Sequence, residues 1–261
     1  MNELIRSLKQ QRQQPITRSH ADHNRPDHDS LKRIGVKGLQ IRKPEQLEHV
    51  NALIIPGGES TTMAKLAEYH NLFPALRNFI KTGKPVWGTC AGLIFLADKA
   101  VGQKLGGQEL VGGLDCTVHR NFFGSQIQSF EADLLVPELA ATEGGPASFR
   151  GVFIRAPAIL ETGPDVQVLA DYAVPPGKSV TSGSDVESQA EKTGREEKVI
   201  VAVKQGNLLA TAFHPELTTD TRWHSFFLKM VGGDQSFYCD SSLNGDDGDQ
   251  QQARPDLPVF Q

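Results

Sequence analysis

Two short apolar runs, each passing through glycine into a helical pattern, constrain the fold of this chain more than any other feature. The runs ALII (52–55) and KPVWG (84–88) lack the polar–apolar alternation of a strand with one exposed face. Helical patterns follow at 60–70 and 73–83. Buried strands separated by helices form parallel sheets, so the sequence predicts an α/β fold with three layers, a mostly parallel sheet with helices on both faces.

The remaining expected elements are shorter and are separated by glycine and proline. Ser60 or Thr61 is expected to cap the helix over 60–70. The other expected elements are a strand at 38–41, a helix in LIFLADKA (93–100), strands in LDCTV, FEADLLV and GVFIRAPAIL, two strands joined by a hairpin at 205–207, and a closing helix at 221–231.

Composition divides the chain into one domain and two flanks. Residues 1–30 are rich in Gln, Arg, His and Asp and have almost no apolar period, so they are predicted to be a disordered leader. The domain is expected over 31–232, with loop insertions at about 137–148 and 174–197. Residues 233–261 are acidic and rich in Gln and Pro, and are predicted to be a disordered tail.

Charge and hydropathy exclude several classes of function. The formal net charge of −4 and the isoelectric point of about 6.1 leave no basic footprint for nucleic acid. No apolar run approaches the ~20 residues that cross a membrane, and the N-terminus lacks the apolar stretch of a signal peptide.

The three cysteines, Cys90, Cys116 and Cys239, are odd in number and far apart, which argues against a disulfide framework. A reducing compartment, most simply the cytoplasm, is expected.

The pentapeptide GTCAG (88–92) has the spacing of a nucleophile elbow, with cysteine where hydrolases of that kind use serine. The glycines allow a sharp turn. Cys90 would lie at the carboxyl end of a strand with its sulfur at the head of the next helix, which favours the thiolate. A buried structural cysteine in a tight turn fits the same five residues, and the pentapeptide alone leaves both interpretations open.

A thiolate nucleophile needs a base, and the base needs a group that orients it. In AFHPEL, His214 and Glu216 close an apolar strand, and residues two apart on an extended segment face the same side. An ordinary surface His–Glu pair is the alternative. The histidines of the leader segment HADHNRPDHD are interpreted as part of a solvated polar run, so no metal site is predicted.

Acyl transfer also needs amides that stabilise an oxyanion. The amide of Ala91 is one candidate by the logic of the elbow. Gly57 and Gly58 in IIPGGES offer further accessible amides before a helix, and Gly58 is taken as the second donor. The same stretch lacks the Gly-Lys-Ser/Thr ending of a phosphate loop. A bare turn is the alternative interpretation.

Taken together, GTCAG, PGGES and FHPE resemble the triad glutaminases of class I amidotransferases, which have a flavodoxin-like fold. PGGESTTM, GTCAGLI, HRNFFGSQ, FIRAP and TAFHPEL are similar to one subgroup, the glutaminase subunits of pyridoxal 5′-phosphate synthase. The similarity runs from about residue 31 to 230, and the two insertions are like those of plant-type members. Five motifs in the right order make the resemblance specific.

The resemblance implies hydrolysis of L-glutamine to L-glutamate and ammonia, with the ammonia passed to a synthase subunit of (β/α)₈ type for vitamin B6 synthesis. It implies no cofactor for the glutaminase step. Cys90 would attack the carboxamide, His214 would transfer protons and Glu216 would orient His214. Substrate binding would fall to Gly57, Gly58, Glu59, Arg120, Ile154 and Arg155.

The chain departs from the family at its start. Members of the family begin with an apolar strand that belongs to the interior of the sheet, and residues 1–30 contain no comparable apolar run. The strand is therefore expected to be missing. Its loss would leave backbone N–H and C=O groups of the neighbouring strands unpaired, at a cost of ~1–3 kcal/mol for each buried group. This gives an alternative from another class, a catalytically impaired binding or regulatory variant of the glutaminase subunit.

Overall fold

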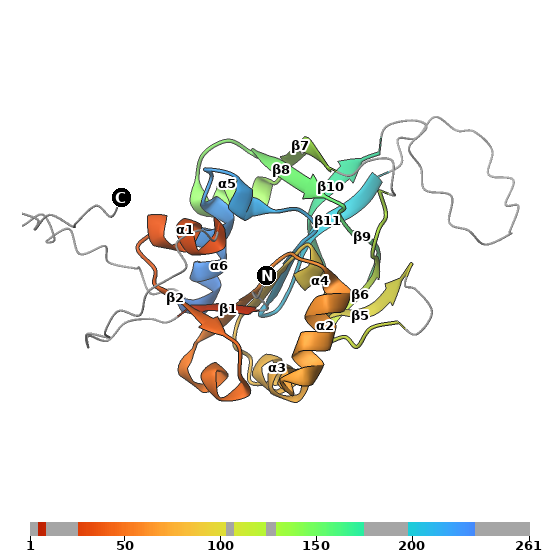
Figure 1. Ribbon diagram of the computed structural model, residues 1–261. Helices are drawn as coiled ribbons and strands as arrows, with labels where there is room; N and C mark the ends of the chain where they lie inside the picture. The colour runs from red at the N-terminus through yellow and green to blue at the C-terminus, as the bar shows by residue number, and fades with distance from the viewer. Residues whose placement is uncertain (1–4, 9–25, 103–106, 124–128, 175–197, 233–261) are drawn as a thin grey trace, which may run out of the picture.

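The computed structural model describes residues 5–8, 26–102, 107–123, 129–174 and 198–232, which form two sheets and their helices (Figure 1). In chain order the elements are β1 (Ile5–Leu8), α1 (Pro26–Arg33), β2 (Gly38–Ile41), η1 (Pro44–His49), β3 (Ala52–Ile55), α2 (Ser60–Tyr69), α3 (Leu72–Lys81), β4 (Val86–Thr89), α4 (Ala91–Leu96), β5 (Ala97–Val101), β6 (Leu114–His119), β7 (Ser129–Leu135), α5 (Pro137–Glu143), β8 (Ser148–Ile154), β9 (Ala158–Thr162), β10 (Gln167–Ala173), β11 (Lys198–Gln205), β12 (Leu208–Thr211), η2 (Pro215–Leu217) and α6 (Arg222–Gly232).

The larger sheet has ten strands in the order β2-β1-β3-β4-β12-β11-β9-β6-β5, with β10 paired to β11. Strands β3, β4 and β12 are mutually parallel, as are β5 and β6, and the other neighbours are antiparallel. The predicted α/β class is confirmed, but the sheet is mixed rather than mostly parallel. Short connections such as the hairpin between β11 and β12 reverse the chain, and a reversal by a short turn requires an antiparallel pair.

Successive residues of β4 point to opposite faces of the sheet and show that helices cover both. The ring of Trp87 packs against His224 and Phe227 of α6, with centroids 5.0 and 5.6 Å apart. A β-carbon on Gly88 would instead overlap the carbonyl of Gly92 in α4. The prediction of a central sheet between two layers of helices is confirmed (Figure 1).

The expectation that the first strand is missing is wrong. Strand β1 lies between β2 and β3 and pairs with both, in register Leu8↔Gly38 and Leu8↔Ala52. It is antiparallel to each neighbour. The expectation was based on the absence of a long apolar run. A strand that fills a gap between two others needs only extended backbone, whose N–H and C=O groups pair with both neighbours. Four residues of the leader, IRSL, supply that backbone.

The predicted boundaries of the domain need two further corrections. Helix α1 begins at Pro26, inside the segment expected to be a disordered leader, and its Leu31 is fully buried in the core. The expected loop at 137–148 contains the helix α5, whose first turn has Pro137 at a position that favours helix initiation. The expected insertion at 174–197, beyond residue 174, and the tail at 233–261 lie outside the described residues.

The remaining local predictions are partly confirmed. The hairpin at 205–207 is present, with Gly206 at a φ of 54°, and the closing helix α6 is present. The helix after Cys90 is shorter than predicted. It ends at Leu96, and the residues Ala97–Val101 form β5 because they pair in parallel with β6. Within the described residues, no helix has the length and apolar character required to cross a bilayer.

Candidate active site

Cys90 occupies a sharp turn between β4 and α4. Its φ of 50° and ψ of −103° lie outside the regions that a side chain with a β-carbon normally adopts. The flanking glycines make the turn possible, because a β-carbon on Gly92 would overlap the carbonyl of Ile55 and one on Gly88 would overlap α4. The amide of Cys90 donates to the carbonyl of Thr211 at 2.8 Å. This strained turn is the geometry predicted for a nucleophile elbow.

His214 and Glu216 follow β12, the strand beside β4. The amide of His214 donates to the carbonyl of Val152 in β8 at 2.8 Å, which fixes the backbone of this residue. His214 Nδ1 and Glu216 Oε1 lie 2.8 Å apart, and both side chains are largely buried. The predicted contact is present, although the predicted extended segment is not. Glu216 lies in the 3₁₀ turn η2, which begins at Pro215 and folds the carboxylate back to the ring.

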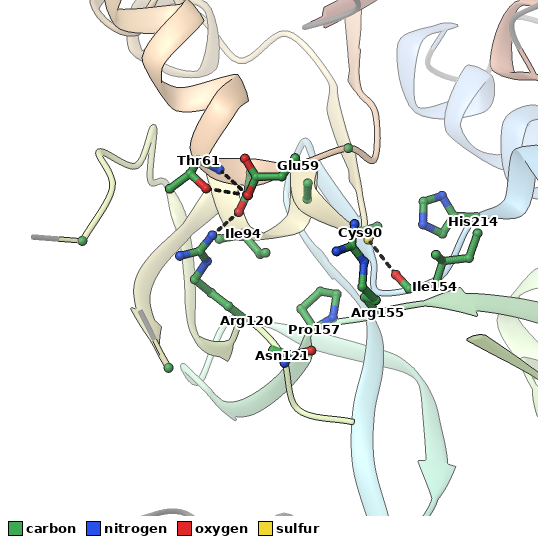
Figure 2. A pocket seen from close by; sticks show the side chains of 15 residues that line it. Glu59, Thr61, Cys90, Ile94, Arg120, Asn121, Ile154, Arg155, Pro157 and His214 are labelled. Atoms are coloured by element: carbon green, nitrogen blue, oxygen red, sulfur yellow. Dashed lines mark hydrogen bonds between the residues drawn. The ribbon is translucent and has the colours of Figure 1, made fainter. Parts of the chain in front are cut away.

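The His214 ring also lies beside Cys90 (Figure 2). Burial alone would lower the pKa of His214, but the interactions of the ring with Cys90 and Glu216 outweigh burial and raise this pKa to about 10. A positively charged imidazole ring beside a cysteine sulfur is the arrangement that activates a cysteine nucleophile. The sequence predicted these three residues as a triad, and the structure brings their side chains together.

A cavity of about 550 Å³ opens beside the sulfur, a size suited to a small molecule (Figure 2). Its lining residues are Gly58, Glu59, Ser60, Thr61, Cys90, Ala91, Ile94, Gly102, Gly107, Arg120, Asn121, Ile154, Arg155, Pro157 and His214.

Most of the residues predicted to bind substrate line this cavity. Gly57 does not; it lies behind the triad, against His214 and the β-carbon of Cys90. Sequence reasoning missed the other lining residues, which are Ser60, Thr61, Ile94, Gly102, Gly107, Asn121 and Pro157. Four of them, Ser60, Thr61, Asn121 and Pro157, lie within two residues of a predicted residue, and Ile94 lies one helical turn after Cys90. Proximity along the chain was therefore the signal that could have identified these five.

The carboxylate of Glu59 caps α2 in place of the predicted Ser60 or Thr61. It accepts the amides of Thr61 and Thr62 at 3.3 and 2.7 Å and both of their hydroxyls at 2.5 and 2.7 Å. Partial burial would raise the pKa of Glu59, but these four bonds lower it to about 2. A permanently charged carboxylate therefore lies at the rim of the cavity (Figure 2).

Two arginines bring positive charge to the cavity from different strands. Arg120 follows β6 and donates from Nη2 to the hydroxyl of Ser60 at the start of α2, while its Nε has no hydrogen-bond partner among the described residues. Arg155 follows β8 and has a positive φ of 44°. The preceding carbonyl, that of Ile154, lies 3.9 Å from the sulfur of Cys90. A cavity with two guanidinium groups beside a cysteine sulfur suits a small substrate that carries a carboxylate.

The described residues contain no cluster of side chains typical of a metal site. No group of three or more His, Cys, Asp or Glu side chains there is arranged to hold an ion.

An α/β sheet with a cysteine elbow at the carboxyl end of a parallel strand, and a His–Glu pair at the end of its neighbour, defines a class I glutamine amidotransferase. A solved structure described as a glutamine amidotransferase superposes with a TM-score of 0.63 at 40% sequence identity, covering 79% of this chain and 93% of that one. The chain belongs to the SNO glutamine amidotransferase family, which matches residues 22–232.

Two curated relatives show which members of the family the chain is similar to. A probable pyridoxal 5′-phosphate synthase subunit PDX2 from Arabidopsis thaliana is 68% identical over 238 residues, 89% of this chain and 93% of the relative. The pyridoxal 5′-phosphate synthase subunit PdxT of Acidothermus cellulolyticus is 49% identical over 197 residues, 76% of this chain and 83% of the relative. The resemblance inferred from the five motifs is confirmed at the level of the family.

Proposed function

We propose that this chain is the glutaminase subunit of a pyridoxal 5′-phosphate synthase, hydrolysing L-glutamine to L-glutamate and ammonia. The observation that carries the proposal is the position of His214, which lies beside Cys90, is hydrogen-bonded to Glu216 and stands at the wall of a substrate-sized cavity. The names of the relatives supply the complex in which the reaction takes place.

The first half-reaction forms a thioester. The thiolate of Cys90 attacks the carboxamide carbon of glutamine, and the carbonyl oxygen becomes an oxyanion. We propose that the amides of Ala91 and Gly58, both at the cavity wall, stabilise it. His214 donates its proton to the amide nitrogen, the C–N bond breaks and ammonia leaves, so that a glutamyl thioester remains on the sulfur.

The second half-reaction restores the enzyme. His214, now neutral, takes a proton from water, and the resulting hydroxide adds to the thioester carbon. The C–S bond breaks, glutamate is released and Cys90 returns as a thiolate beside the imidazolium. Glu216 holds the Nδ1 side of the ring throughout, so that Nε2 faces the sulfur and the substrate.

Substrate specificity is proposed for the residues around the cavity. Arg120 and Arg155 are suited to the α-carboxylate of glutamine, and the charged Glu59 to its ammonium group. The carbonyl of Ile154 and the backbone of Gly58 border the position of the reacting carboxamide. Gly57 contributes by leaving room for His214 rather than by touching substrate.

The alternative of an impaired binding or regulatory variant is not favoured, because β1 fills the gap in the sheet and the triad is assembled. The ammonia acceptor is proposed to be a synthase subunit of (β/α)₈ type, and the complex is proposed to act in the cytoplasm. The cysteines of the described residues, Cys90 and Cys116, are free thiols, as a reducing compartment requires.

The decisive experiment measures glutamate release from glutamine with and without a synthase subunit from a related plant complex. Activity in the presence of the synthase, and its loss in Cys90→Ala, are expected. Cys116→Ala is the matched control, since Cys116 is buried away from the cavity and burial raises the pKa of its thiol to about 12. Full activity in Cys90→Ala, or no activity in the wild-type chain with a bound synthase, would contradict the proposal.

A further inference from the structure

Helix α1 contacts the short turn that carries Glu216. Its last residue, Arg33, donates from Nη2 to the carbonyl of Thr218 at 3.2 Å and from Nη1 to the carbonyl of Thr219 at 3.3 Å. The Nη2 atom also donates to the hydroxyl of Ser30, one turn earlier in the helix, at 2.9 Å. One guanidinium thus joins the start of the domain to the segment immediately after the triad.

The turn η2 is held by few bonds of its own. The amides of Leu217 and Thr218 donate to the carbonyls of His214 and Pro215 at 3.2 and 3.1 Å, and the Thr218 hydroxyl adds a bond of 3.0 Å to Pro215. The carbonyls at the end of such a turn point out of it and need donors from elsewhere. Arg33 supplies donors to two of them, and a planar fork is suited to neighbouring carbonyls.

Helix α1 is itself fixed at its other end. Asp27 Oδ1 lies 3.5 Å from His224 Nε2 of α6, and both side chains are fully buried. Between the two ends, Leu31 is 1% exposed within the core. Figure 1 shows α1 beside α6. The guanidinium of Arg33 therefore stands on an anchored helix and can restrain the turn instead of moving with it.

We propose that Arg33 is a positioning residue for the glutaminase reaction, acting through the backbone of Thr218 and Thr219 to hold Glu216 against His214. The inference rests on the proposed function, because that function supplies the reaction. The contacts of Arg33 with Thr218 and Thr219 do not depend on which substrate is bound. No residue of α1 is among those lining the cavity, so Arg33 is not expected to touch glutamine.

The first test is steady-state kinetics of the chain bound to its synthase. Arg33→Ala is expected to lower kcat roughly three- to tenfold and to leave KM for glutamine unchanged, because only the orientation of the base is affected. Arg33→Lys, which keeps the charge without the fork, is expected to restore part of the loss. Lys32→Ala removes a neighbouring exposed charge from the same helical turn and is expected to be silent.

The second test distinguishes positioning from a general loss of stability. The rate of alkylation of Cys90 by iodoacetamide reports its thiolate and is read by mass spectrometry of the Cys90 peptide. Arg33→Ala is expected to slow alkylation in the wild-type background and to have no further effect in Glu216→Gln, since the two changes act on one contact. An equal effect in both backgrounds, or an unchanged kcat in Arg33→Ala, would overturn the proposal.

The alkylation test needs neither synthase nor glutamine. If the wild-type chain released no glutamate with its synthase, the proposed function would fail, while the coupling between Arg33 and Glu216 would still be measured. If Arg33→Ala did not fold, as judged by thermal unfolding, Arg33→Gln would replace it, because it keeps one donor and most of the side chain.

Discussion

Gly57 lies directly against the ring of His214. A β-carbon built at residue 57 would stand 3.0 Å from Nδ1, overlap Cε1, and lie 3.4 Å from the β-carbon of Cys90. The backbone at residue 57 therefore lies so close to His214 that any side chain at this position would overlap the ring of the proposed catalytic base. This relationship explains why a glycine is needed at a position that does not line the cavity.

Gly57→Ala is expected to displace the His214 ring and to lower kcat about a hundredfold, because small misplacements of a catalytic group have effects of that size. Gly35→Ala is the control. Its β-carbon would meet nothing within 4 Å, but its φ of 77° makes the substitution strained. Glutamate release and thermal unfolding together check this: Gly35→Ala should cost stability and keep activity. Normal kcat in Gly57→Ala would show that His214 tolerates the displacement.

Glu216→Gln is expected to change the pH dependence of the reaction. Glu216 is one of the two groups that raise the pKa of His214 to about 10, so its neutralisation should lower that pKa. The imidazolium would then be lost at a lower pH, and the alkaline limb of the kcat/KM profile should move toward neutrality. Profiles of wild type and Glu216→Gln, measured over the same buffers, check the shift. An alkaline limb in the same place would mean that another group controls it.

The contacts of the proposed triad could be predicted from the sequence because the motifs that form them are local. GTCAG fixes a turn within five residues, and His214 and Glu216 are two residues apart, so their contact follows from short-range geometry. The same holds for the hairpin at Gly206. Arg120 and Arg155 were placed by resemblance alone, since nothing in their immediate neighbours indicates which strand ends meet.

The errors arose where distant contacts decide the structure. Residues Ala97–Val101 contain good helix formers and yet form β5, because β6 offers an edge for pairing. The segment Ile5–Leu8 becomes a strand because two others leave a gap for it. Glu59 caps α2 instead of Ser60 because its longer side chain reaches two amides and two hydroxyls at once. None of these outcomes is visible in a window of the sequence.

Arg120→Lys is expected to raise KM for glutamine by about tenfold or more with a smaller change in kcat. A guanidinium fork that binds a carboxylate is replaced by a single ammonium group, and a hydrogen bond to a charged group contributes ~1.5–3 kcal/mol. Arg150→Lys is the matched control, since Arg150 pairs with Glu131 at an exposed position on β7 and β8. An unchanged KM in Arg120→Lys would remove this residue from the substrate site.

Glu59→Gln is expected to weaken the fold in a pH-dependent way. The folded-state pKa of Glu59 is lowered from 4.5 to about 2 by its bonds to Thr61 and Thr62, so its contribution to stability is present above about pH 4.5 and is lost as the pH falls through about 2. Loss of a helix cap costs ~1 kcal/mol, which lowers Tm by ~2–4 °C in a domain of this size. Thermal unfolding at pH 7 should show this difference between wild type and variant, and the difference should shrink as the pH approaches 2. Glu68→Gln, on the same helix and without these cap bonds, is the control. A constant difference at every pH would mean that the carboxylate's charge does not stabilise α2.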